Sequence, residues 1–574
     1  MRRGAVNLRI QISLWRESYI LLTKYLFFMR KIFITFVLLT SAVLAGANTV
    51  INVETAGTLK TLIGENKLTT TDLVVSGNLN GSDIQVIREM AGIMLSGGPS
   101  GGKLARLDMT DANIVAGGDY YMYDYNTYEN FYTADNELGK YMFYNCPALQ
   151  SVVIPKSVTA IGVEAFSVCA NLKDVSVPET NSAFYSIDGV LFGKLDARLI
   201  KYPQARTETE YSIPNGIRNI GYEAFSDCVA LTKINFPGTI ENIDGAAFSF
   251  CNGITVMELP ASVKTIKASA FNYCKNLTAI NVPTSCAAFV SEDGVLYNKT
   301  KTVLVRCPQK KTGSFTVADG ITILGDYAFH GCLKLTKITL PTGLTTIGEW
   351  TFSSCKELTS IDIPVSVANI GQGAFCDCTE IGSVAVPEGV TGIFKWTFYG
   401  CIKLLSVALP ASLTELGEGA FMGCRELTEL SVPENVNIVP PSAFGNCKKL
   451  RKLSLPKAIT QIGHYAASGC AALEDLYLYA ENPPSCGFYP FNGVDKQKCK
   501  LYVPKDTKAR YQSAGGFSDF NNIIEIETSG IAAILEDNNE TVHYTIGGIP
   551  TKTPLKGINI VRTRDGKTRK IIVR

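Results

Sequence analysis

The stretch AFSVCANLKDVSVP, residues 165–178, decides the fold of this chain, because its frame recurs along most of the sequence. Clear echoes are AFNYCKNLTAINVP at 270–283 and AFMGCRELTELSVP at 420–433. A fixed period of this size is typical of a solenoid, in which stacked units bury one continuous core. The cysteine of the frame recurs every 23 residues with two longer gaps, at Cys146, Cys169, Cys228, Cys251, Cys274, Cys332, Cys355, Cys378, Cys401, Cys424, Cys447 and Cys470.

Each unit carries a constant pattern of apolar residues around its cysteine. A Phe generally precedes the cysteine by three residues, and a Leu or Ile follows it by three. Next comes an alternating run that ends in Pro, as in Ile361-Asp362-Ile363-Pro364. Alternation predicts a strand with one buried face, and Pro ends it because Pro cannot donate to a continuing ladder. An apolar residue followed by Gly, as in Ile347-Gly348, predicts a turn that needs positive φ or close backbone approach. We therefore expect coils of strand, Pro turn, second extended piece, Gly turn and a short helical or bent Ala-Phe-x-x-Cys segment.

The twelve repeat cysteines raise the question of metal or disulfide chemistry. Zinc sites place cysteines a few residues apart, which a 23-residue period does not do. Neighbouring coils about 4.8 Å apart are within disulfide range, but equivalent cysteines in stacked coils point the same way rather than converging. We predict a structural ladder of buried free thiols that act as small hydrophobic side chains, with no metal or cofactor.

The repeat resembles the BspA-like class of leucine-rich repeats of bacterial and some protist surface proteins, over roughly residues 141–480. The resemblance implies a β-rich solenoid of parallel-strand coils with short helical or bent segments, capped at both ends. It also implies exposure outside the cell and binding to host or neighbouring-cell proteins. Two departures suggest that the array closes near its end: Ala467 replaces the Phe, and Tyr479 stands where Pro is expected.

The two longer spacings match the longer repeat variant of this family, near residues 178–213 and 283–318. Residues 178–203 align without gaps on 283–308, and in both an Asp-Gly-Val-Leu run predicts a turn into a strand. In this internal alignment Cys286 replaces Asn181 and Cys307 replaces Tyr202. Two cysteines gained together suggest a disulfide between Cys286 and Cys307. Independent burial of the two thiols is the alternative.

The N-terminal residues 1–47 read as an upstream extension and a secretory signal peptide. Met29-Arg30-Lys31 supplies the basic part, residues 32–44 are mostly apolar, and small residues up to Ala47 predict the cleavage site. The apolar run is shorter than the roughly 20 residues of a membrane span. We expect cleavage, with an uncleaved anchor as the alternative, and a secreted or cell-surface location (outer membrane or extracellular) with no transmembrane span after cleavage.

The array is expected to lie between an N-terminal cap, residues 48–140, and a C-terminal cap, residues 481–527. Residues 528–574 predict a short C-terminal β tail. The tail resembles the C-terminal segment of many exported Bacteroidetes proteins, which is related in pattern to type IX sorting domains. Its basic bias allows a second interpretation, attraction to an acidic surface polymer.

The N-terminal cap ends in a group of tyrosines that is the candidate ligand contact. Tyrosine side chains offer contact area and a hydroxyl at low entropy cost. A loop packed over the cap is the alternative explanation. The tyrosines are Tyr120, Tyr121, Tyr123, Tyr125, Tyr128 and Tyr132.

Composition and motifs narrow the class of function. Lys plus Arg number 54 against 52 Asp plus Glu, a balance without the basic excess expected of a nucleic-acid-binding protein. The three histidines, His330, His464 and His543, lie in no spacing that suggests a catalytic triad, and no hydrolase or P-loop motif occurs. We predict a non-enzymatic protein that mediates adhesion or protein–protein contact with extracellular or host proteins. Carbohydrate capture through the tyrosine group and a structural cell-envelope role without a ligand are the alternatives.

Overall fold

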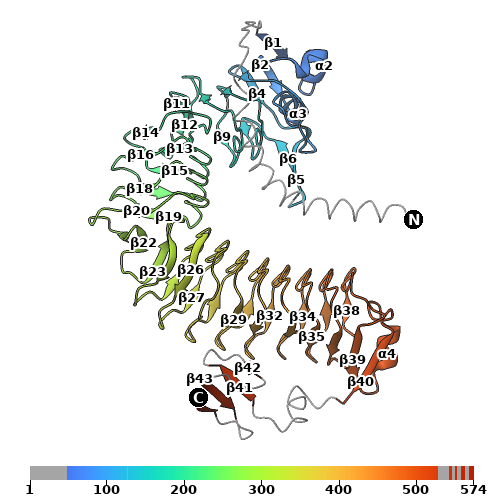
Figure 1. Ribbon diagram of the computed structural model, residues 1–574. Coiled ribbons are helices and arrows are strands. Elements are labelled where there is room, and N and C mark those ends of the chain that lie inside the picture. Colours follow the sequence, from blue (N-terminus) through green and yellow to red (C-terminus); the bar gives the residue numbers. More distant parts are fainter. Residues whose placement is uncertain are drawn as a thin grey trace, which may run out of the picture. The chain divides into compact units, whose positions relative to one another are not determined.

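The computed structural model describes residues 48–125 and 127–527 and, beyond them, the backbone of four C-terminal strands (Figure 1). The expected signal peptide and upstream extension, residues 1–47, lie outside the described residues. Within the described part, no helix combines the length and the apolar character that crossing a membrane requires.

The described chain is a stack of parallel-strand coils, which confirms the predicted β-rich solenoid. Most of the strands that follow a cysteine bury one central residue, such as Val175 or Leu430, and their ends are less buried. Most of these strands pair in parallel with the equivalent strand 23 residues on, as Glu429 does with Lys452. They are β8 Ser151–Val153, β10 Asp174–Ser176, β14 Glu210–Ser212, β16 Lys233–Asn235, β18 Val256–Glu258, β20 Ala279–Asn281, β24 Thr312–Thr316, β26 Lys334–Thr339, β29 Ser383–Ala385, β31 Ser406–Ala408, β33 Glu429–Ser431, β35 Lys452–Leu455 and β37 Asp475–Leu478.

A second row of two-residue strands lies after the Pro turn and leads into the Gly position. At Gly371 an added Cβ would meet backbone atoms of Gly348 and Glu349 in the preceding coil at 2.5–2.7 Å. Close approach of neighbouring coils, rather than a positive φ, therefore requires glycine here. The strands are β7 Glu137–Leu138, β9 Ala160–Ile161, β15 Asn219–Ile220, β17 Asn242–Ile243, β19 Thr265–Ile266, β25 Ile323–Leu324, β27 Thr346–Ile347, β28 Asn369–Ile370, β30 Gly392–Ile393, β32 Glu415–Leu416, β34 Ile438–Val439, β36 Gln461–Ile462 and β38 Ser485–Cys486.

The Ala-Phe-x-x-Cys segment is bent into turns and is not a helix. In the coil of Cys355, the backbone N–H groups of Trp350, Phe352 and Ser354 donate to carbonyls of the next coil at 2.7–2.9 Å. Trp350 and Ser354 both have left-handed φ angles, 53° and 59°. Because these donors are directed at the neighbouring coil, they are not free for an intrahelical ladder, and the segment stays bent.

Each long repeat inserts an antiparallel hairpin before the array resumes. In the first, β11 and β12 pair around the turn at Asp188 and Gly189, and β13 then joins β15 in parallel. The second repeats this arrangement. The buried core divides into three clusters near these two insertions. The inserted strands are β11 Phe184–Ile187, β12 Val190–Gly193, β13 Arg198–Lys201, β21 Phe289–Glu292, β22 Val295–Asn298 and β23 Val303–Arg306.

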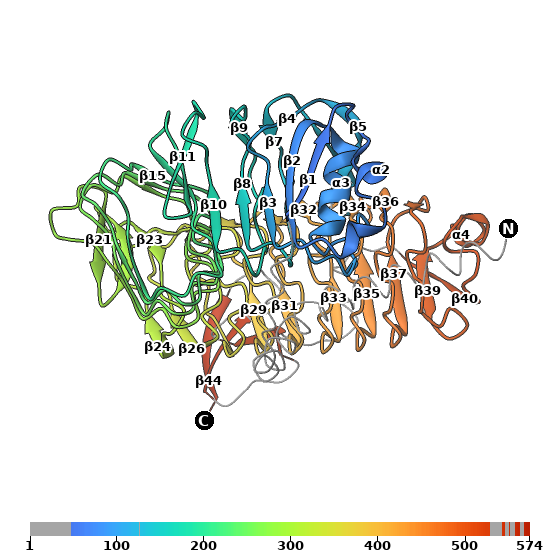
Figure 2. The ribbon, with the colours of Figure 1, turned by 90° about the horizontal axis from the view of Figure 1, so that it is seen from above.

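The N-terminal segment continues the solenoid sheet, with β1, β2, β3, β8 and β10 side by side (Figure 2). Helix α3 begins after a capping box formed by Asn80 and Asp83 and packs Ile84 and Ile87 into the core. A hairpin of β5 and β6 follows and contacts α3. The elements are β1 Thr49–Val53, α2 Leu59–Ile63, the 3-10 helix η2 Gly64–Leu68, β2 Asp72–Leu79, α3 Gly81–Met90, β3 Arg106–Asp108, β4 Ala112–Ile114, β5 Gly117–Asp124 and β6 Glu129–Thr133.

At the other end, β39 pairs with β37 and β40, and the short helix α4 lies between β39 and β40 in the chain. Tyr511, Phe517 and Phe520 bury their rings there. The described strands of the tail form an antiparallel sheet in the order β42-β41-β43-β44. The elements are β39 Lys500–Pro504, α4 Lys508–Ser513, β40 Asn522–Ile526, β41 Val542–Thr545, β42 Pro550–Thr551, β43 Gly557–Arg562 and β44 Thr568–Val573.

Candidate functional site

The β5–β6 hairpin carries the six predicted tyrosines, and four of them form one cluster, which we name the tyrosine face. Its members are Tyr120, Tyr123, Tyr125 and Tyr132. The Tyr123 and Tyr125 rings meet edge to face with centroids 4.6 Å apart, and Tyr120 meets Tyr132 at 6.3 Å. Tyr125 and Tyr132 are exposed, and Tyr120 and Tyr123 are half-buried. Tyr128, near the hairpin turn, is 78% exposed.

Tyr121 differs from the other five tyrosines. It is only 1% exposed, and its hydroxyl donates to the carbonyl of Lys140 at 2.8 Å. Burial raises the pKa of Tyr121 above its ordinary value. The structure therefore divides the predicted group: Tyr121 is buried in the N-terminal segment, and the tyrosine face lies at the surface.

The twelve repeat cysteines are all buried and free. Most thiols donate to the carbonyl of the Phe 26 residues earlier, in the preceding coil, and burial raises the pKa of such thiols as Cys378. Cysteine thus fills a small apolar site and also gives the buried carbonyl a donor, which at Phe352 adds to the N–H of Cys355. The sulfur–oxygen distances are 2.9–3.2 Å for Cys169, Cys251, Cys274, Cys355, Cys378, Cys401, Cys424, Cys447 and Cys470.

Cys286 and Cys307 are free thiols and are not brought together as a bonded pair. The Cys286 sulfur lies 3.6 Å from the carbonyl oxygen of Val263, in one core cluster. Cys307 belongs to the next cluster and takes a place in the row of stacked Phe rings. The N–H of Cys307 donates to the carbonyl of Ala328 in the next coil, and the N–H of Phe329 donates in the same way to the carbonyl of Thr351. The structure thus has the alternative arrangement, two thiols buried separately.

The three cysteines without the short carbonyl contact, Cys146, Cys228 and Cys332, each begin a run of regular coils. A buried cation lies beside each of these first coils. Arg88 donates to the carbonyls of Tyr141 and Met142 at 3.0 and 2.9 Å. Lys201 donates to the carbonyl of Glu223, and Arg306 donates to those of Phe271, Tyr327 and His330. Tyr141, Glu223 and Tyr327 share one turn position, five residues before the cysteine. The cations supply donors where a regular preceding coil is missing.

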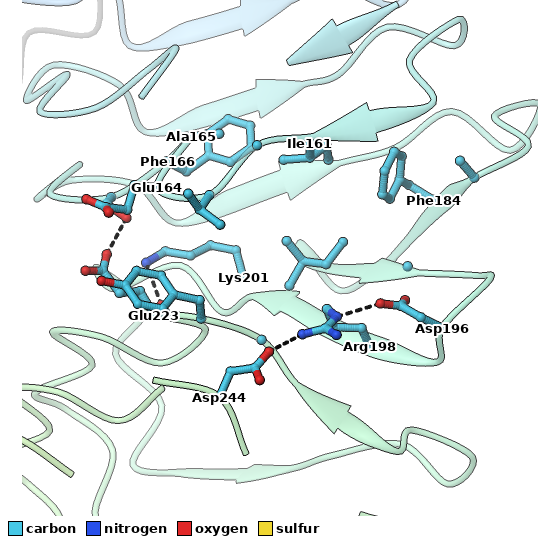
Figure 3. Close-up of a pocket in the computed structure, with 18 of the residues that line it drawn as sticks. Ile161, Glu164, Ala165, Phe166, Phe184, Asp196, Arg198, Lys201, Glu223 and Asp244 are labelled. Atoms are coloured by element: carbon cyan, nitrogen blue, oxygen red, sulfur yellow. Dashed lines mark hydrogen bonds and ion pairs between the residues drawn. The ribbon is translucent and has the colours of Figure 1, made fainter. Parts of the chain in front are cut away.

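The first long repeat also leaves a cavity of about 480 Å³ between the coils of Cys169 and Cys228 (Figure 3). Its apolar wall includes Ile161, Phe166 and Phe184. Two groups of charged residues also line it. Arg198 forms ion pairs with Asp196 and Asp244. The other group contains Glu164, Glu223 and Lys201.

Glu164 and Glu223 occupy the same turn position in the two coils that border the cavity, with φ of 59° and 53°. The Ser167 hydroxyl donates to the Glu223 carboxylate at 2.5 Å. Burial, and then the charge of Glu223, raise the pKa of Glu164 to about 7. The equivalent positions in the second long repeat hold Ser269 and Tyr327, so this acidic pair is specific to the first.

A row of aromatic side chains on the bent segments is a surface feature that the sequence did not predict. Its members are Phe250, Tyr273, Tyr327, Trp350 and Trp396, which we name the aromatic row. They lie one or five residues before a repeat cysteine, where most other coils have a small or polar residue. The signal available in the sequence was the presence of aromatic residues at these positions in successive coils. The sequence interpretation weighed the outward strand positions and did not compare these turn positions.

In the described part of the chain, no three His, Cys, Asp or Glu side chains are grouped to hold a metal ion. His330 is buried, and burial lowers its pKa to about 3. Nδ1 of His464 accepts a hydrogen bond from the N–H of Phe488 at 2.8 Å. The absence of enzymatic activity and of a cofactor stays a prediction.

Comparison with known proteins identifies the family. No curated protein matches the chain. Similar solved structures include a leucine-rich repeat protein of Eubacterium ventriosum, with 24% identity over 64% of this chain and 82% of that one, and a TM-score of 0.39. A leucine-rich repeat protein of Bacteroides ovatus has 21% identity over 66% and 90%, with a TM-score of 0.32. The pneumococcal vaccine antigen PcpA has 21% identity over 74% and 85%, with a TM-score of 0.38.

The assignment rests on the family model and on the repeat, because these TM-scores are too low to carry an argument. The model described as BspA type leucine-rich repeat region matches residues 136–204, 202–302, 306–426, 380–498 and 416–529. These ranges cover more than half of the chain and include every repeat cysteine. The chain therefore belongs to the BspA-type leucine-rich repeat family.

Proposed function

We propose that this chain is an exported, surface-exposed solenoid that mediates adhesion by binding a host or neighbouring-cell protein through its tyrosine face. The observation that carries the proposal is the arrangement of Tyr120, Tyr123, Tyr125 and Tyr132 in one partly exposed cluster on the β5–β6 hairpin. Tyrosine is enriched at protein interfaces because it buries a large area while its hydroxyl keeps a polar partner.

The strand rows of the solenoid are less suited to this role. Outward residues of these rows bond to neighbouring coils, as where Asn281 donates to the Glu258 carboxylate and Asn242 donates to Asn219. Ion pairs such as Lys334–Glu357 and Lys403–Glu380 likewise join positions 23 residues apart. These ladders stabilise stacking and leave few polar groups for a partner.

Binding of the full chain to immobilised matrix and serum proteins, beside a glycan array, tests the proposal. The variant Tyr123→Ala/Tyr125→Ala/Tyr132→Ala is expected to lose protein binding with an unchanged unfolding midpoint. Tyr121→Ala is the matched control on the same strand. Because its side chain is buried, this control should lower stability by about 3 kcal/mol.

Each outcome decides between the alternatives. Saturable protein binding that the triple variant abolishes supports adhesion through the tyrosine face. Binding to glycans alone would assign the same face to carbohydrate capture. Absence of binding to both proteins and glycans would contradict the proposal and favour a structural role in the cell envelope. Protein binding that the triple variant retains would also contradict it, and would place the contact on another surface of the chain.

A further inference from the structure

The aromatic row runs across successive coils as a chain of ring contacts. Phe250 and Tyr273 stack with centroids 4.6 Å apart. The His330 ring, 4.9 Å from Tyr273 and 5.5 Å from Tyr327, continues the contacts across the second long repeat. Tyr327 then stacks on Trp350 at 6.5 Å, and Trp350 meets Trp396 at 5.9 Å. Phe250 and Tyr273 are exposed, and the other members of the row are half-buried.

These aromatic residues occupy a backbone conformation that disfavours them. Tyr327, Trp350 and Trp396 have φ of 57°, 53° and 58°. Such angles are uncommon for bulky residues, although this turn position is left-handed in other coils too, as at Glu223 and Ser442. Glycine holds the same turn position in two neighbouring coils, at Gly373 and Gly419. Glycine would fit this backbone with less strain, whereas the aromatic residues add ring contacts between coils.

The glycines of the neighbouring coils hold the two indole rings in place. A Cβ added at Gly373 would lie 2.5 Å from Cε3 of Trp350. One added at Gly419 would lie 2.8 Å from Cδ1 of Trp396. Each indole therefore lies directly over a bare backbone, which fixes the ring while its outer part remains accessible. Contact residues held in place in this way lose little entropy on binding.

The charges beside the row are mostly acidic. On the bent segments from Asp326 to Glu418, the acidic residues are Asp326, Glu349, Asp377 and Glu418. The basic residues are Lys395 and Lys356, which acts on Asp377, and Lys267 lies on the segment of Tyr273. Lys395 pairs with Glu418 at 2.9 Å. Its ammonium also lies 4.3 Å from the centroid of the Trp396 ring. Lys395 thus places a cation on an indole ring and beside a carboxylate, which is the arrangement that a cationic side chain of a partner would adopt.

We propose that the aromatic row and the acidic residues beside it bind an extended, arginine- or lysine-rich segment of a partner protein. Cationic side chains gain from the ring faces and from the carboxylates together. A neutral glycan could donate hydroxyl hydrogen bonds to the carboxylates but would gain no attraction between opposite charges, and an anionic polymer would be repelled. This surface belongs to the repeat coils and does not depend on the tyrosine face.

Calorimetric titration of the full chain at physiological salt tests the proposal. The probes are a peptide of alternating Arg and Ser, its counterpart with Glu in place of Arg, and cellohexaose. The Arg peptide is expected to bind, and Trp350→Gly/Trp396→Gly is expected to weaken it about tenfold. Glycine suits the left-handed backbone, so the variant should fold. Tyr465→Gly is the matched control: it has the same turn position and a φ of 55°, and it lies outside the row.

Two further variants separate the sources of affinity. Asp326→Asn/Glu349→Gln keeps the rings and should also weaken the Arg peptide, whereas Tyr123→Ala/Tyr125→Ala/Tyr132→Ala should bind it as the native chain does. The proposal is overturned if the Arg peptide does not bind, if the Glu peptide binds equally, or if only cellohexaose binds. Equal loss in Trp350→Gly/Trp396→Gly and Tyr465→Gly would overturn it too.

Discussion

At the scale of single residues, the repeat cysteine has two roles, and its reactivity follows from them. All seventeen thiols of the chain are free, and only that of Cys486 is not fully buried. Burial also raises the pKa values of thiols such as Cys228 and Cys274 to about 12. A thiol-reactive dye at pH 8 should therefore label at most Cys486 in the folded chain, because the thiolate is the reactive form. Under denaturing, non-reducing conditions all seventeen thiols should react; two fewer would indicate a Cys286–Cys307 disulfide.

The buried cations beside the first coil of each run are the basis of a second prediction at the scale of single residues. Arg306 is 1% exposed and donates to the carbonyls of Phe271, Tyr327 and His330, and Met in its place would remove all three hydrogen bonds. Arg306→Met should lower the free energy of unfolding by about 3 kcal/mol. Lys201→Met is the comparison, because Lys201 donates to one carbonyl at 3.3 Å and should matter less. Urea unfolding measures both, and equal losses would contradict this account.

Glu164 predicts how stability depends on pH. Its pKa is raised to about 7 from an ordinary value of 4.5, so the folded chain holds a proton that the unfolded chain has released between these values. Stability should therefore fall as pH rises from 4.5 to 7. Glu164→Gln removes this contribution and should flatten the profile of unfolding midpoint against pH in that interval. A slope that is unchanged in the variant would assign it to other groups.

At the scale of elements, the capping box of α3 connects two parts of the N-terminal cap. The Asp83 carboxylate accepts from the N–H groups of Gly57, Leu59 and Asn80 at 2.6–3.0 Å, and Asp83 is fully buried. Asn80 itself accepts at the helix start. Asn80→Ala should cost about 1 kcal/mol, and Asp83→Ala more, about 3 kcal/mol, because three donors lose their partner. Thermal unfolding orders the two variants; a milder effect for Asp83→Ala would show that the donors find other acceptors.

At the scale of the whole molecule, the sequence predicted the features that recur in every repeat, and it did not predict contacts that differ between coils. The 23-residue period requires equivalent side chains to stack, so the coils, the buried cysteines and the hairpins of the long repeats followed from it. The thiol–carbonyl hydrogen bonds, and those that Arg88 and Arg306 donate to backbone carbonyls, depend on the geometry of a neighbouring coil. The sequence of one repeat does not determine that geometry. The sequence did not separate Tyr121 from the exposed tyrosines. The N-terminal segment has no 23-residue repeat, so no equivalent coil shows which face of its strands is buried.

The division of the core into three clusters makes the last prediction, on how the solenoid unfolds. The clusters span residues from Val53 to Leu191, from Val190 to Leu296 and from Val295 to Ile523. In a solenoid each coil contacts only its neighbours. Where the contact between two runs of coils is weaker than the contacts within them, each run is expected to unfold as a separate unit. Leu453→Ala, at a fully buried site of the last cluster, should cost about 3 kcal/mol. Hydrogen exchange should then accelerate in the coils after Arg306 while residues 49–166 keep their native protection. Equal acceleration in both regions would mean that the long repeats transmit stability as well as the regular coils do.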